Sequence, residues 1–304
     1  MGDYIMIACD LGSNTLRIVE LDCHTGRRIR EFERMVKTAD GLHESALIND
    51  EAVERIIYAI NEAKEIFDLS KAHAVTTAAI RIAKNGAEVL AKIKSSTGVS
   101  FIMINALEEA RLTSLAVSWR LECLGYHDSY VLMDLGGGST EITLGELSQS
   151  FDVGIVTIAQ KYASVKGIEG HIEQELSPLF TFLDTLEKAT RFVATAGTPT
   201  TVAAFKQGLD YAHYDAGKVN GSLLSKKDLD DALSRLLEMD EKERTRWVGV
   251  GRDDLIVAGI LLVQATMIHA GFDEMLVIDD GLREGLALAK CKEKLSFSAH
   301  INLN

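Results

Sequence analysis

The stretch that decides the fold is Tyr130-Val-Leu-Met-Asp134-Leu-Gly136-Gly137-Gly138-Ser139-Thr140-Glu141-Ile142-Thr-Leu144. Residues 130–133 form a short apolar run that ends at a carboxylate, and residues 140–144 alternate between polar and apolar side chains. This pattern predicts a strand, a glycine turn and a second strand. Asp134 and Glu141 then lie at the two ends of the turn.

The glycine turn suits the binding of an anion. Gly136, Gly137 and Gly138 can adopt positive φ and let backbone N–H groups converge on a phosphate, while the two flanking carboxylates can hold a hard cation through oxygen ligands. The alternative is a tight hairpin with solvated acids. A dinucleotide fingerprint does not fit, because position 141 is Glu rather than Gly, and the chain has no GxxxxGK[ST] run.

The same pattern occurs near the start of the chain, in Ile5-Met-Ile-Ala-Cys9-Asp10-Leu11-Gly12-Ser13-Asn14-Thr15-Leu16-Arg17-Ile18-Val19. The two Asp-Leu-Gly triplets are 134 − 10 = 124 residues apart, a distance that fits one domain. We therefore predict two similar lobes, each with a phosphate turn, although a chance match of three common residues is the alternative.

The rest of the chain alternates between strand and helix patterns, which predicts an α/β fold. Strands are expected at 27–36, 72–76, 100–104, 150–158, 191–196 and 274–278, and helices at 49–67, 85–95, 107–121, 168–186, 225–238, 252–270 and 282–293. The loop at 125–128 is the expected joint between the lobes, because the second Asp-Leu-Gly strand follows it directly.

Composition restricts the class of protein. The chain has 304 residues, 47% hydrophobic and 25% charged, with a formal net charge of −13. A negative charge disfavours nonspecific nucleic-acid binding, and the apolar run 255–263 is too short to cross a bilayer. The first residues do not resemble a secretory signal, so we expect a cytoplasmic protein with no nucleic-acid or membrane partner. The four cysteines lack CxxC spacing and the histidines lack HxxxH spacing, so we expect reduced cysteines and no zinc site.

Two further segments carry candidate chemistry. Thr198 before Pro199 predicts an N-cap with proline at the first helical position, so that Gly197 and Thr198 would offer a third anion site; the alternative is a capped helix without a ligand. Glu108 and Glu109 begin a predicted helix, where the helix dipole favours carboxylates whatever their function. The pattern alone does not say which of the two, if either, is catalytic.

Seven ordered blocks carry a family resemblance. They are Asp10-Leu-Gly-Ser-Asn-Thr-Leu-Arg17, Thr77-Ala-Ala-Ile-Arg81, Glu108-Glu109-Ala-Arg111, Asp134-Leu-Gly-Gly-Gly-Ser-Thr-Glu141, Ala196-Gly-Thr-Pro-Thr-Thr201, Arg252-Asp-Asp-Leu-Ile-Val-Ala-Gly259 and Asp280-Gly-Leu-Arg-Glu-Gly285. Their order resembles the exopolyphosphatase and guanosine pentaphosphate phosphohydrolase (Ppx/GppA) family in its short form. The resemblance implies two actin-like, ribonuclease-H-type lobes with the active site in the interlobe cleft. The lobes would span 1–125 and 126–285, with a C-terminal helix at about 286–304 on the first lobe.

The resemblance also implies an activity and roles for individual residues. Members of the family release terminal orthophosphate from inorganic polyphosphate or from pppGpp with a divalent cation, usually Mg²⁺. Glu109 matches the general base that activates water, and Asp134 and Glu141 match the acids associated with the metal. The positions that match phosphate or substrate contacts are Gly12, Ser13, Asn14, Arg17, Arg81, Gly136, Gly137, Gly138, Ser139 and Arg252.

Some positions depart from the family pattern. Asn105-Ala106 stands where Ser-Gly is common, Ala78 replaces the usual serine before Arg81, and Lys37 replaces an arginine. Longer relatives add C-terminal domains, so processive digestion of long chains is not expected here. Two other functions stay open: a noncatalytic sensor of polyphosphate or guanosine penta- or tetraphosphate, and an actin-like ATP-dependent kinase. A homodimer is also open.

Overall fold

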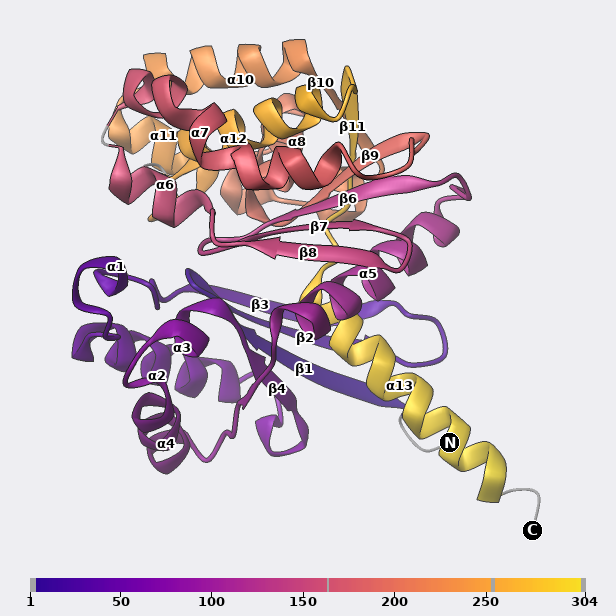
Figure 1. Ribbon diagram of the computed structural model, residues 1–304. Helices are drawn as coiled ribbons and strands as arrows, with labels where there is room; N and C mark the ends of the chain where they lie inside the picture. Colours follow the sequence, from indigo (N-terminus) through magenta and orange to yellow (C-terminus); the bar gives the residue numbers. More distant parts are fainter. Residues whose placement is uncertain (1–3, 163, 253–254, 302–304) are drawn as a thin grey trace. The chain divides into compact units, whose positions relative to one another are not determined.

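The computed structural model describes residues 4–162, 164–252 and 255–301. The chain divides into two compact units (Figure 1). The first unit comprises the residues up to Ala116 together with those from Leu282 onward, and the second runs from Val117 to Gly281. The helix α5 (Ala106–Cys123) contributes residues to both units.

The first unit is built on a five-stranded sheet of order β3-β2-β1-β4-β5. The antiparallel strands are β1 (Ile5–Leu11), β2 (Thr15–Asp22) and β3 (Arg28–Met35), and β4 (His73–Thr76) and β5 (Ile102–Met103) run parallel to β1. Helix α2 (Asp50–Lys64) packs on β2 and on α4 (Gly86–Thr97), and α13 (Leu282–Ile301) packs along β1 and β2. The short helices are α1 (Leu42–Ser45), η1 (Leu69–Lys71) and α3 (Ala78–Ile82).

The second unit is built on a six-stranded sheet of order β10-β11-β9-β6-β7-β8. Its strands are β6 (Tyr130–Leu135), β7 (Thr140–Leu144), β8 (Leu147–Phe151), β9 (Arg191–Thr195), β10 (Ser222–Ser225) and β11 (Glu274–Val277). Its other helices are α6 (Ile155–Lys161), α7 (Val165–Leu183), α8 (Gly197–Lys206), η2 (Tyr211–His213), α9 (Ala216–Val219), α10 (Lys226–Glu238), α11 (Glu241–Val248) and α12 (Ile256–His269).

The two sheets share one topology, which confirms the predicted repeat. In each unit an antiparallel hairpin leads to a third antiparallel strand, and the first strand of the hairpin also pairs with a later parallel strand. The order β3-β2-β1-β4-β5 therefore corresponds to β8-β7-β6-β9-β11, with β10 as an additional edge strand. A parallel strand needs a crossover connection, and helices supply it in both units.

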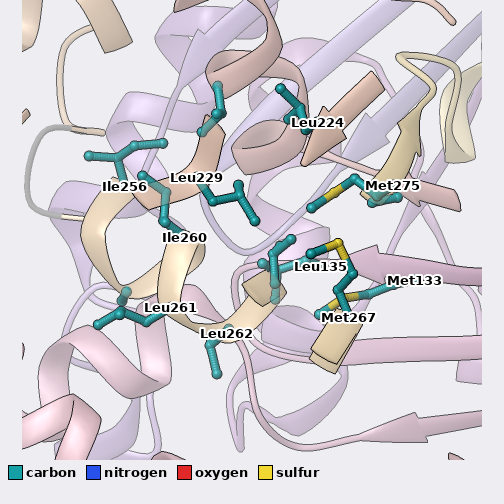
Figure 2. Close-up of a cluster of buried hydrophobic side chains, with 14 of the residues drawn as sticks. Met133, Leu135, Leu224, Leu229, Ile256, Ile260, Leu261, Leu262, Met267 and Met275 are labelled. Carbon is teal, nitrogen blue, oxygen red and sulfur yellow. The ribbon is translucent and has the colours of Figure 1, made fainter. Parts of the chain in front are cut away.

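Helix α12 occupies the core of the second unit (Figure 2). Apolar side chains surround most of its circumference, as expected for a helix that is covered on every side. Ile260, Leu261 and Leu262 are buried with Met133 and Leu135 of β6 in one cluster. This packing places the strand that leads into the second glycine turn on a rigid support. Across the described residues, no helix combines the length and apolar character needed to cross a bilayer.

Three sequence expectations were wrong or too broad. The strand expected at 150–158 ends at Phe151, and helix α6 begins at Ile155 because the N–H of Gly154 donates to the Thr157 hydroxyl, which donates back to the Gly154 carbonyl. The strand expected at 100–104 contains only Ile102 and Met103. The helix expected at 252–270 begins at Ile256 as described, and Asp253 and Asp254 lie outside the described residues.

The expectation that all cysteines are reduced was also wrong for two of them. Cys23, which follows β2, forms a disulfide with Cys291 of α13, although 268 residues separate them in sequence. Cys9 is buried and Cys123 is exposed, and both are free thiols. Spacing rules did not reveal the disulfide, because the packing of α13 along the first hairpin brings the two cysteines together. The disulfide fastens the C-terminal helix to the sheet of the first unit.

Candidate active site

The first turn, Gly12-Ser13-Asn14, joins β1 to β2 and is held by the backbone that follows β3. The N–H of Gly12 donates to the Thr15 carbonyl at 2.9 Å, which closes the turn. The Asn14 carbonyl accepts N–H bonds from residues 36 and 37, each at 2.9 Å, and the Ser13 carbonyl accepts the N–H of Ala39 at 2.8 Å. The carbonyl groups of the turn are thus directed into the protein.

The second turn, Gly136-Gly137-Gly138-Ser139, is held in the same way. The N–H of Gly136 donates to the Ser139 carbonyl at 3.0 Å, and residues 155 and 156 at the start of α6 donate to the carbonyls of Gly136 and Gly137 at 3.1 and 2.9 Å. The helix N-terminus that follows the third strand therefore binds the turn's carbonyls and is not left for a ligand. This role of α6 was not predicted, because the residues that form its start were expected to form a strand.

Two central N–H groups in each turn remain available for an anion. Among the described residues, no carbonyl or side chain accepts from the N–H groups of Ser13, Asn14, Gly137 and Gly138. Successive N–H groups in such turns form concavities that bind phosphate oxygens. Gly154 lets α6 approach, since a Cβ there would lie 2.5 Å from the Gly137 carbonyl oxygen.

The two carboxylates of the second unit lie on neighbouring strands. Asp134 at the end of β6 is paired in register with Glu141 at the start of β7. Glu141 is 3% exposed, and its Oε1 accepts a 2.6 Å hydrogen bond from the Ser150 hydroxyl of β8, which fixes the orientation of the carboxylate. In the first unit the corresponding register pair is Asp10 and Arg17, so the acidic pair belongs to the second turn alone.

The acidic pair fits a cation that takes oxygen ligands. Among the described residues, no three His, Cys, Asp or Glu side chains converge on a ready-made metal site. Two carboxylates are nevertheless a usual donor set for Mg²⁺, which keeps several waters and shares the oxygens of a bound phosphate. Asp134 and Glu141 therefore have the chemistry to hold such an ion together with a substrate.

The structure separates the two adjacent glutamates of α5. The Glu109 side chain is 12% exposed, and its Oε2 lies 3.3 Å from Nη1 of Arg81, which also donates to the Ile104 carbonyl at 3.0 Å. The Glu108 side chain is 40% exposed and forms a two-point ion pair with Arg111. Hydrogen bonding to Arg111 lowers the pKa of Glu108 and keeps it ionised. Glu109 is the shielded and oriented carboxylate of the two.

Arg81 has donors beyond those that hold Glu109. Its Nη1 makes both bonds to the rest of the first unit, and the side chain is 25% exposed. An arginine carries five N–H donors in a rigid fork. The remaining N–H groups on Nε and Nη2 can therefore bind phosphate oxygens while Nη1 keeps the Glu109 carboxylate in place.

The other two predicted arginines contact residues of their own units. Nε of Arg17 lies 2.9 Å from Oε2 of Glu33 on the neighbouring strand β3. The guanidinium of Arg252 lies over the ring of Tyr211 at 5.7 Å from its centroid. Arg17 thus forms an ion pair within the sheet, and Arg252 stacks on an exposed aromatic ring.

The predicted capping role of Thr198 was wrong. Helix α8 begins two residues earlier than predicted, at Gly197, and its N-cap is Ala196 with φ of 77° and no capping side chain. Thr198 is 2% exposed, and a Cβ at Gly259 of α12 would lie within 2.9 Å of the Thr198 Cβ. Its side chain is therefore used in packing against α12 and not at the end of the helix, because Gly259 leaves room for it.

Buried ion pairs surround the Asp280–Gly285 segment and were not predicted from the sequence. In the second unit, Asp280 accepts bonds of 2.7 and 3.1 Å from Arg120 of α5. In the first unit, buried Glu284 pairs with Arg28 at 3.2 Å and with Arg283 at 2.7 Å. The sequence signal for these ion pairs was the group of charged residues in a segment that otherwise contains only glycine and leucine.

Comparison with known proteins places the chain in a family. Residues 18–294 match the model of the Ppx/GppA phosphatase family. The chain belongs to the Ppx/GppA phosphatase family. It is 28% identical to "Exopolyphosphatase 2" of Mycobacterium tuberculosis over 316 residues, which cover 93% of this chain and 97% of that protein.

Solved structures agree with this membership. The Aquifex aeolicus Ppx/GppA family member is 28% identical with a TM-score of 0.73, over 95% of this chain and 99% of that one. An exopolyphosphatase from Cytophaga hutchinsonii has a TM-score of 0.83 at 21% identity, over 95% and 98%, and supports the fold. The fold is therefore α/β with two actin-like lobes, as the sequence predicted, and membership in this phosphatase family makes the chain a hydrolase.

Proposed function

We propose that this Ppx/GppA family member releases terminal orthophosphate from inorganic polyphosphate and from pppGpp with the help of a divalent cation. Glu109 serves as the general base, Arg81 and the two glycine turns bind phosphate, and Asp134 and Glu141 hold the cation. The observation that carries the proposal is the Arg81–Glu109 pair, in which one guanidinium orients a shielded carboxylate and keeps further donors for an anion. The names of the relatives support polyphosphate as the substrate class.

The chemistry follows from what these groups can do. Glu109 accepts a proton from a water molecule as that water attacks the terminal phosphorus and the bridging oxygen leaves with the shortened chain. Arg81 and the N–H groups of the turns stabilise the negative charge on the equatorial oxygens, which is most of what phosphoryl transfer requires of a protein. When bound, Mg²⁺ neutralises phosphate charge and orients the oxygens.

The direct test is phosphate release from polyphosphate and pppGpp, measured side by side with Mg²⁺ present and after its removal with EDTA. The proposal expects release from both substrates that requires the cation. Binding of either substrate without any phosphate release would contradict the proposed hydrolase activity and support a noncatalytic sensor. Release from polyphosphate alone would remove pppGpp from the proposal.

Arg17 and Arg252 are proposed to favour the nucleotide substrate. A guanidinium can bind phosphate oxygens in a two-point contact and can stack on a base, and Arg252 already stacks on Tyr211. Arg17→Ala and Arg252→Ala should each lower kcat/KM for pppGpp by about 10- to 150-fold, which corresponds to about 1.5–3 kcal/mol, and should affect short polyphosphate less.

Glu33→Gln is the matched control for Arg17, because it removes the ion-pair partner and keeps the guanidinium. It should leave most of the pppGpp activity intact. Equal losses on the two substrates in the arginine variants would mean general phosphate binding, and no loss on either would exclude the two arginines from the substrate site.

A further inference from the structure

Gly285 allows the backbone of α13 to contact the backbone of α5. A Cβ at this position would lie 2.5 Å from the Leu112 carbonyl carbon, closer still to its oxygen, and 3.2 Å from its Cα. The obstruction would be backbone and not a side chain that could turn away. Leu112 is itself 2% exposed, so the contact lies inside the first unit.

Leu112 lies three residues after Glu109 on the same helix. Residues at this spacing are neighbours on a helix surface, and a helix moves nearly as a rigid body over one turn. Any displacement of the α5 backbone at Leu112 is therefore passed to Glu109. Since ordinary contact begins near 3.4 Å, the carbonyl carbon alone requires a separation of 3.4 − 2.5 = 0.9 Å, and the nearer carbonyl oxygen requires more.

Ion pairs and buried apolar side chains hold the first turn of α13 on the first unit. Arg283 donates to Glu284 at 2.7 Å and to Glu31 of β3 at 3.0 Å, and Arg28 at the start of β3 lies 3.2 Å from Glu284. Leu282 and Leu286 are buried on either side. At the start of α5, Arg81 contacts Glu109, and the Asn105 side chain accepts the Glu108 N–H.

We propose that Gly285 is a positioning residue for Glu109, and this inference rests on the proposed role of Glu109 as general base. Close approach at Gly285 sets the spacing between α13 and α5, and so sets the position of Glu109 beside Arg81. Gly285→Ala moves α5 by roughly 1 Å, and a misplacement of that size in a catalytic group can cost up to about 10²-fold in rate.

The experiment compares Gly285→Ala with Gly170→Ala. Gly170 lies inside helix α7, where an added Cβ meets no atom within 4 Å, so the control makes the same chemical change in a helix without the obstruction. With polyphosphate as substrate, Gly285→Ala should lower kcat by about 10- to 100-fold and change KM by less than about threefold. Gly170→Ala should change neither. A normal kcat for Gly285→Ala overturns the inference.

A double-mutant cycle separates positioning from general damage. If Gly285 acts through Glu109, adding Gly285→Ala to Glu109→Gln should cost little beyond the single Glu109→Gln loss, because the misplaced group is already disabled. An equal loss in both backgrounds would assign Gly285 a merely structural role. If Glu109→Gln keeps full turnover, the proposed base is wrong; if Glu109→Gln is impaired and Gly285→Ala is not, only the positioning inference fails.

A second variant covers the case in which Gly285→Ala does not fold. Glu31→Gln removes the half-exposed partner of Arg283 and loosens the first turn of α13 without touching the backbone contact. We expect kcat to fall by about two- to fivefold, within the range of such ion pairs, and the loss to disappear in the Glu109→Gln background. An unchanged kcat in Glu31→Gln would contradict the inference.

Discussion

Loss of the Cys23–Cys291 disulfide should lower the stability of the chain substantially. The bond closes a loop across a sequence separation of 268 residues, for which the chain-entropy model gives about 5–6 kcal/mol, whereas measured disulfides usually contribute about 2–4 kcal/mol. We adopt the measured range, because an unfolded chain with residual structure gains less from a crosslink. At about 2–4 °C per kcal/mol, the melting temperature should fall by roughly 5–15 °C.

The assay is thermal unfolding of the wild type without and with dithiothreitol, and of Cys291→Ser and Cys123→Ser. Cys291→Ser should have the melting temperature of the reduced wild type. Cys123→Ser should have the melting temperature of the oxidised wild type, because Cys123 is an exposed free thiol. A thiol titration of the unfolded, unreduced protein should find the two free cysteines. Four titratable thiols, or a Cys291→Ser variant as stable as the oxidised wild type, would refute the reasoning.

Three other outcomes are expected. Asp134→Ala and Glu141→Ala should each need more Mg²⁺ for half-maximal phosphate release or lose activity at every Mg²⁺ concentration, and unchanged titrations would exclude both as ligands. Gly154→Ala should raise KM for polyphosphate by about tenfold or more in a protein that is still folded, because a Cβ there would lie 2.5–2.8 Å from the backbone of the second turn. An unchanged KM would contradict the support that we assign to α6. Burial raises the pKa of Cys9 to about 12, so iodoacetamide at pH 8 should label Cys123 in the folded protein and leave Cys9 unmodified, as mass spectrometry would show.

Local pattern was sufficient for the repeated part of the fold. The apolar run, Asp-Leu-Gly and the alternating strand after it define each hairpin, and both predicted hairpins are present. The apolar 255–263 run became a helix buried on all sides, because its length and lack of charge exclude an exposed position. These features depend on neighbours in sequence, which a pattern can show.

The features that pattern could not show depend on distant contacts. Thr198 has a good capping sequence, yet Gly259 of another helix provides the space that takes its side chain. Residues 155–158 are all β-branched, but Gly154 and Thr157 start a helix whose N–H groups hold the second turn. The pairing of Cys23 with Cys291 likewise follows from the packing of α13.

The choice between the two adjacent glutamates required side-chain partners. Both glutamates lie in the first turn of the helix, where the helix dipole favours carboxylates, so the sequence pattern does not distinguish them. The structure pairs Glu108 with Arg111 one turn away on the exposed surface, and pairs Glu109 with Arg81 from another helix. The contact between Arg81 and Glu109, which are 28 residues apart in sequence, distinguishes the two glutamates.

The measurement that tests the central claim most directly is the turnover number for phosphate release from polyphosphate by Glu109→Gln, with Glu108→Gln as the matched control. Glu109→Gln should lower kcat by about 10²–10⁴-fold, the usual contribution of a positioned general base, with the melting temperature unchanged. Glu108→Gln removes only an exposed ion pair and should stay within a few-fold of the wild type. Near-normal turnover by a fully folded Glu109→Gln variant would contradict the assignment of Glu109 as the base.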